Sequence, residues 1–99
     1  MSSTGTGWSD WLDLNSEIIS TVPESPGVFM MHAKMKVMYI DGTDNLRKGL
    51  FEAIKRPCVS EAKRFRYMPT LSPQAIKDEL INDYKKRHEG KLPECMKET

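Results

Sequence analysis

The sequence has no long apolar run and little cysteine. Nothing in its 99 residues approaches the ~18 consecutive apolar residues of a membrane-spanning helix. No charged start followed by an apolar core indicates a signal peptide. The two cysteines, Cys58 and Cys95, are too few for a disulfide framework. These absences predict a cytoplasmic protein with no membrane partner, whose cysteines are free thiols.

Zinc-ligand spacing is also missing. Cys58, Cys95, His32 and His88 are residue types that bind zinc, but they form no C-x-x-C or H-x-x-x-H pattern. If the two cysteines meet in space, a small buried pair is a simpler explanation than a set of metal ligands.

The chain has almost no net charge, with 15 basic and 14 acidic residues. This excludes the strongly basic footprint of a committed DNA-binding protein. The charge is uneven, however: residues 1–35 carry one base and four acids (−3), and residues 36–99 carry 14 bases and 10 acids (+4). A mildly basic C-terminal two-thirds is compatible with contact to phosphate groups.

Apolar spacing predicts one small domain with the element order helix, strand, strand, helix, strand, helix. Residues 1–21 form an N-terminal extension that is Trp-rich and partly helical, and residues 22–99 form the domain itself. A small antiparallel sheet flanked by helices, an α+β fold, is the simplest packing of these elements. The sequence ranges of the predicted strands are 27–32, 36–40 and 64–68.

Part of this pattern resembles the opening of a GIY-YIG nuclease domain. Gly27–Phe29 stands for the family's Gly-Ile/Val-Tyr strand, Tyr39–Asp41 for its Tyr-Ile/Val-Gly strand, and Asn45–Lys48 for the start of the next helix. The approach Val22–Val28 resembles the nuclease subunit of bacterial nucleotide excision repair. The resemblance covers residues 22–96 and implies a three-stranded antiparallel sheet flanked by helices, to which the Trp-rich segment is an addition.

The resemblance implies cleavage of phosphodiester bonds with one Mg²⁺ or Mn²⁺ ion. A glutamate supplies a hard oxygen ligand, an arginine stabilises charge on the phosphate, and tyrosine hydroxyls position water. Only Tyr39 and Glu79 keep the functional residue type in this chain. The first tyrosine is Phe29, the arginine position falls on Gly49, and the glycine that closes the second strand is Asp41.

Other positions of the implied site are also altered. Ala53 stands where some members have a histidine, and Met96 aligns with a supporting asparagine. The loss of one electrostatic donor costs about 10²–10³ in rate, and the loss of a proton-transfer group about 10²–10⁴. A degenerate domain is therefore favoured over an active enzyme, although Asp41 and Glu79 leave open a two-carboxylate metal site.

Three functions stay open. The favoured one is a degenerate nuclease-like domain that retains contact with DNA. The second is an active metal-dependent DNA endonuclease with a rearranged site that uses Tyr39, Glu79, Asp41 and Lys48. The third is a protein-interaction module or homodimer, with Trp8 and Trp11 at the contact surface. The basic residues assigned to nucleic-acid contact are Arg47, Lys48, Lys63, Arg64 and Arg66. The simpler alternative for residues 63–67 is a strand with one solvated and one buried face.

Overall fold

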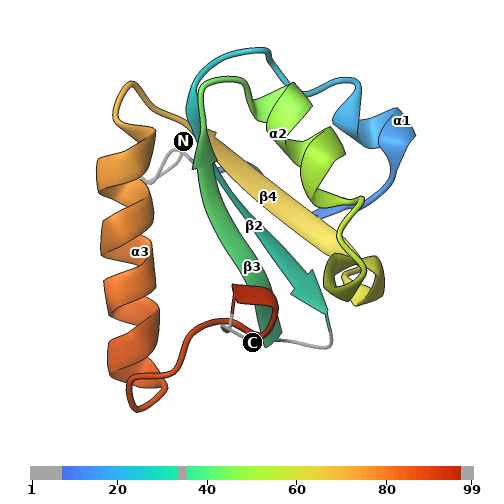
Figure 1. Cartoon of the computed structure of the whole chain (residues 1–99). Helices are drawn as coiled ribbons and strands as arrows, with labels where there is room; N and C mark the ends of the chain where they lie inside the picture. The colour runs from blue at the N-terminus through green and yellow to red at the C-terminus, as the bar shows by residue number, and fades with distance from the viewer. Residues whose placement is uncertain (1–7, 34–35, 97–99) are drawn as a thin grey trace.

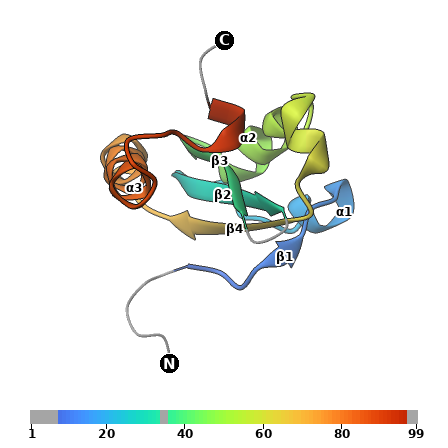
Figure 2. The ribbon, with the colours of Figure 1, turned by 90° about the horizontal axis from the view of Figure 1, so that it is seen from below.

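The chain forms an antiparallel sheet between two helical layers (Figures 1 and 2). The computed structural model describes residues 8–33 and 36–96. The sheet has four strands in the order β1-β4-β2-β3. The strands are β1 (Leu12–Asp13), β2 (Gly27–Ala33), β3 (Lys36–Thr43) and β4 (Arg64–Pro69). The helices are α1 (Ser16–Ile19), α2 (Leu46–Ala53), α3 (Pro73–Arg87) and the short 3₁₀ helices η1 (Cys58–Glu61) and η2 (Glu94–Met96).

The predicted α+β fold is confirmed. The N-terminal extension contributes a strand to the sheet in addition to a short helix. Leu12 pairs with Phe65 and Asp13 with Arg64, so β1 adds a fourth strand to the predicted three. The helical part of the extension is the single turn α1, whose N-cap Asn15 accepts a hydrogen bond from the Ile18 amide at 2.8 Å. Among the described residues, no helix is long and apolar enough to span a membrane.

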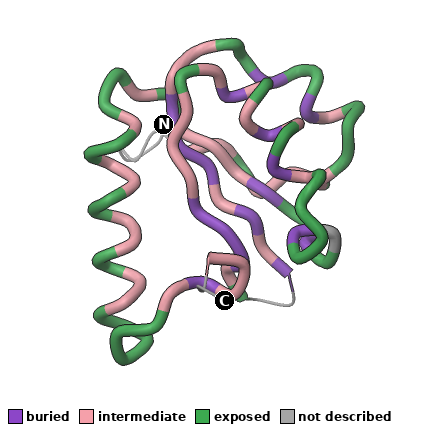
Figure 3. The backbone as a smooth tube through the Cα atoms, in the orientation of Figure 1, coloured by how far each residue is buried: buried purple, intermediate pink, exposed green. Residues whose placement is uncertain are grey.

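Alternation along β2 divides the sheet into two faces. Phe29 and Met31 are buried in the core beneath α1 and α2, together with Leu46 and Leu50 of α2. Met30, between them in sequence, points to the face that α3 covers. Figure 2 shows α3 on one side of the strands and α1 and α2 on the other. In Figure 3 many of the buried residues lie on the strands, whereas α3 has no buried residue.

The prediction of free thiols is wrong. Cys58 in η1 and Cys95 in η2 form a disulfide, with Cα atoms 5.6 Å apart and a sequence separation of 37. The tertiary fold brings these two short helices together, and neither cysteine has a local motif that indicates the pairing. The disulfide attaches the C-terminal end of the described chain to the connection between α2 and β4.

Candidate functional site

A pocket of about 150 Å³ lies where β3 ends and α2 begins, and it contains several of the positions that the sequence singled out. Phe29 lies next to it, with its ring centroid 6.1 Å from that of Tyr39. Tyr39 and Asp41 lie on the same side of β3 because they are two residues apart along the strand. The lining residues are Tyr39, Asp41, Gly42, Thr43, Gly49, Glu52, Ala53 and Arg56.

Asp41 is surrounded by donors. Its Oδ2 accepts a hydrogen bond from the Tyr39 hydroxyl at 3.0 Å, and its Oδ1 accepts one from the Gly42 amide at 2.8 Å. The Lys77 ammonium, from the first half of α3, lies 3.1 Å from the same Oδ1. The Asp41 and Lys77 side chains are 30% and 26% exposed, so this ion pair is partly shielded from water. Both carboxylate oxygens are therefore already in use.

Tyr39 is held in its neutral form. Burial, the charge of Asp41 and the hydrogen bond to Asp41 together raise the pKa of Tyr39 to about 12, in that order of size. The Arg56 guanidinium, 5.1 Å from the centre of the tyrosine ring, opposes this shift. At neutral pH the hydroxyl is a donor to Asp41 and does not accept a proton from water.

The α3 residue that pairs with Asp41 is Lys77, not the predicted metal ligand Glu79. Glu79 is exposed on α3, and two residues along a helix correspond to a rotation of ~200° from Lys77. The sequence pattern indicates the helix that faces Asp41 but does not single out Lys77, because the direction in which α3 faces depends on its docking against β3. Asp41 thus pairs with Lys77, and a two-carboxylate site of Asp41 and Glu79 stays a prediction.

The residues of the pocket do not fit a divalent metal ion. Such an ion needs several hard oxygen ligands, and the Asp41 carboxylate instead faces the Lys77 ammonium. Within residues 8–33 and 36–96, no group of three or more His, Cys, Asp or Glu side chains is placed to hold a metal. Glu52 also lines the pocket but is exposed.

Gly49 is tightly enclosed by its neighbour Thr43. A Cβ atom built on Gly49 would lie 2.9–3.0 Å from the Thr43 side chain, closer than real contacts allow. A larger residue at this position would therefore require Thr43 to move. The packing around position 49 therefore leaves no space for an arginine side chain unless Thr43 shifts.

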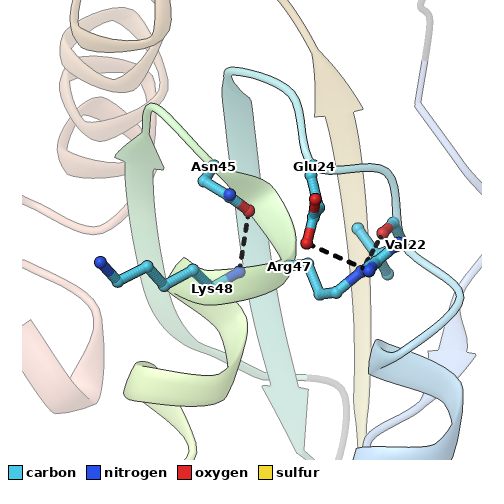
Figure 4. A network of polar contacts seen from close by, with 5 residues as sticks. All are labelled: Val22, Glu24, Asn45, Arg47 and Lys48. Atoms are coloured by element: carbon cyan, nitrogen blue, oxygen red, sulfur yellow. Dashed lines mark hydrogen bonds and ion pairs between the residues drawn. The ribbon is translucent and has the colours of Figure 1, made fainter.

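Arg47 and Lys48, the neighbouring cations on α2, do not replace the missing arginine. Arg47 donates from Nε to the Val22 carbonyl at 2.8 Å and from Nη1 to Glu24 at 3.1 Å. Figure 4 shows the Arg47 and Lys48 side chains running in opposite directions from the helix. Lys48 is exposed, and its amide donates a hydrogen bond at 3.0 Å to the side chain of Asn45, the N-cap residue of α2. Neither residue lines the pocket.

The remaining basic candidates lie elsewhere on the molecule. Arg64 forms an ion pair with Asp13 at 3.2 Å, which links β4 to β1. Arg66 is enclosed by Trp8 and Trp11 on the α3 side of the sheet. Lys63 is exposed just before β4. All three predicted arginines thus make contacts within the protein, while Lys48 and Lys63 point to solvent.

The sequence matches no protein-family model and no curated protein. Solved structures are similar to it, among them the GIY-YIG N-terminal endonuclease domain of UvrC from Thermotoga maritima. A point mutant of that domain bound to its catalytic divalent cation has a TM-score of 0.61 and 18% identity, over 83% of this chain and 93% of that one. The magnesium-bound form has a TM-score of 0.59 and 19% identity, over 80% and 91%. The chain therefore has the GIY-YIG fold.

Proposed function

We propose that this chain is a GIY-YIG-like domain that does not cut phosphodiester bonds. The observation that carries the proposal is the Lys77 ammonium 3.1 Å from Asp41. The similar Thermotoga maritima domain binds a catalytic divalent cation, whereas here a protein cation neutralises the carboxylate nearest to Tyr39. A divalent ion would have to displace Lys77 and overcome its positive charge.

The other altered positions support the same proposal. Phe29 has no hydroxyl, Gly49 has no charged group, and Ala53 contributes only a methyl group to the pocket. Tyr39 keeps its hydroxyl, but that hydroxyl is a donor to Asp41. Position 49 therefore offers no side chain to stabilise a developing phosphate charge, and the Tyr39 hydroxyl is engaged as a donor and does not act as a base.

The test is a cleavage assay with Mg²⁺ and Mn²⁺ on duplex and single-stranded DNA. We expect no cleavage above the background of a mock purification, and no difference between the wild type and Tyr39→Phe. Cleavage that disappears in both Tyr39→Phe and Asp41→Asn would overturn the proposal in favour of an active, rearranged nuclease. Cleavage that survives in both variants would indicate a contaminating nuclease.

We further propose that the domain retains weak contact with nucleic acid, through the exposed side chains of Lys48 and Lys63. The support is the likeness in fold to a nuclease domain and the excess of basic residues after position 35. The engagement of Arg47, Arg64 and Arg66 within the protein leaves two of the five predicted basic residues for phosphate, so the affinity is expected to be low.

A further inference from the structure

A second and larger hollow lies on the opposite face of the sheet. α3 covers only part of this face, and a groove of about 490 Å³ remains between α3 and the N-terminal segment. Met30 and Ile40 form its apolar floor, Leu80 and Tyr84 of α3 line one wall, and Trp11 and Arg66 line the other. This volume is within the range of ~300–1,000 Å³ that is typical of small-molecule sites.

Arg66 is the unusual member of this groove. Its guanidinium carbon lies 4.6 Å from the ring centre of Trp8 and 4.7 Å from that of Trp11. Its Nη2 is 4.0 Å from the Met30 sulfur, and its Nε is buried with no hydrogen-bond partner among the described residues. A partly desolvated cation with an unsatisfied donor is costly unless an anion reaches it.

The charges of the lining residues leave Arg66 without compensation. The groove is lined by Lys36, Arg66 and Arg87 against Asp83, a balance of three cations and one anion, or +2. Lys36 pairs with Glu94 at 2.9 Å and Arg87 with Asp83 at 3.3 Å. Within the part of the chain that the structure describes, no acidic side chain forms an ion pair with Arg66. The groove is thus complementary to a negative charge at one wall.

We propose that this groove binds a small organic anion that carries an oxyanion, either phosphate or carboxylate, on a flat apolar body. The oxyanion would pair with the Arg66 guanidinium, which presents parallel N–H donors to such groups. The apolar body would cover Met30 and Ile40 between Trp11 and Leu80. This site is separate from the Tyr39–Asp41 pocket, and its existence does not depend on the function proposed for that pocket.

The two tryptophans provide a direct test, because they are the only ones in the chain and both flank Arg66. Titration of the full chain with phenyl phosphate should change tryptophan fluorescence saturably, and benzoate tests whether a carboxylate serves as well. Inorganic phosphate, which lacks the apolar body, and phenol, which lacks the charge, should each bind at least about tenfold more weakly. Equal binding of inorganic phosphate would overturn the apolar part of the proposal.

The matched variants are Arg66→Met and Lys86→Met. Arg66→Met keeps an unbranched apolar stem between the indoles, and it should weaken phenyl phosphate by about tenfold or more. Lys86→Met removes the same charge from an exposed position on α3 outside the groove and should bind as the wild type does. Equal affinity of all three proteins would overturn the role of Arg66.

NMR on the wild-type protein provides a second test, which depends neither on tryptophan fluorescence nor on correct folding of the Arg66→Met variant. In wild-type protein labelled with ¹⁵N, phenyl phosphate should shift the Arg66 Nε–H signal and the amides of Met30, Ile40 and Tyr84. Shifts confined to Tyr39, Asp41 and Gly42 would place the anion in the other pocket and overturn the proposal. The absence of any saturable shift at millimolar phenyl phosphate would do the same.

Discussion

The side chain of Lys77 neutralises the carboxylate of the candidate site. An ammonium 3.1 Å from Asp41 satisfies the carboxylate and repels any cation that approaches it. Phe29, Gly49 and Ala53 remove functional groups, but Lys77 adds an opposing one. The capacity for metal binding should therefore depend more on position 77 than on any of the other altered positions.

The first prediction at this scale concerns Lys77→Glu. This change removes the ammonium and places a second carboxylate beside Asp41, so Mg²⁺ or Mn²⁺ should shift the NMR signals of Tyr39, Asp41 and residue 77 at millimolar concentration. The wild type should show no such cluster. Lys86→Glu makes the same charge change at an exposed position of α3 and should behave as the wild type. Clustered shifts in the wild type would contradict the argument.

The second prediction concerns the ionisation of Tyr39. Because the pKa is raised from 10.0 to about 12 in the folded protein, the folded state keeps its proton where the unfolded state loses it. The contribution of Tyr39 to stability is thus complete below pH ~10 and declines as the pH rises towards ~12. Alkaline titration of tyrosine absorbance should show a step near pH 12 that Tyr39→Phe removes. A titration curve with no such step in the wild type would contradict this assignment.

At the scale of elements, η2 covers the edge of the sheet. β3 is an outer strand, and its Ile40 amide donates to the Met96 sulfur at 3.3 Å. Lys36 at the start of β3 pairs with Glu94 at 2.9 Å, and the Cys58–Cys95 disulfide holds η2 in place. An uncovered outer strand presents free backbone groups to other chains, so η2 protects β3 from intermolecular pairing.

Removal of the disulfide tests how much it stabilises the fold and holds η2 against β3. A loop of 37 residues is closed by the bond, and its loss should lower the free energy of unfolding by about 3–4 kcal/mol on the chain-entropy account. Chemical denaturation of Cys58→Ser/Cys95→Ser against the oxidised wild type measures the difference. The amide of Ile40 should also exchange its hydrogen faster in the variant. Reduced wild type should match the double variant, and an unchanged midpoint in both would show that the bond contributes nothing.

At the scale of the whole molecule, the two hollows lie on opposite faces of one sheet. The Tyr39–Asp41 pocket lies on the side of α2 and the Arg66 groove on the side of α3. Trp8 and Trp11, which the sequence proposed as a contact surface for a homodimer, enclose Arg66 in the monomer. Self-association stays a prediction, to be checked by light scattering.

Nucleic-acid affinity is also a property of the whole surface. With two exposed lysines as the main contacts, the logarithm of the binding constant for duplex DNA should fall with log salt at a slope of about −1 to −2. Fluorescence anisotropy at several salt concentrations measures the slope, and Lys48→Glu/Lys63→Glu should abolish binding. Lys55→Glu/Lys86→Glu provides a control of equal charge at other exposed positions. Affinity that is absent at low salt, or insensitive to salt, would remove the binding proposal and leave the fold unaffected.

Local sequence signals determined most of the fold. Apolar runs bounded by turn residues predicted β2 and β3, and the alternation of basic and apolar residues predicted β4. The observed strands start at the predicted residues and extend past their predicted ends. The ordered Gly27–Phe29 and Tyr39–Asp41 elements identified the family whose fold the chain has. They also placed Tyr39, Asp41 and Gly49, which the structure gathers in one pocket.

The tertiary structure alone decided which side chains meet. Glu79 and Lys77 belong to the same predicted helix, and only the docking of α3 against β3 selects Lys77 as the partner of Asp41. The pairing of Cys58 with Cys95 and the enclosure of Arg66 by two tryptophans likewise join segments far apart in sequence. Periodicity reports how a segment is oriented about its own axis, and it carries no information on which distant segment will pack against it.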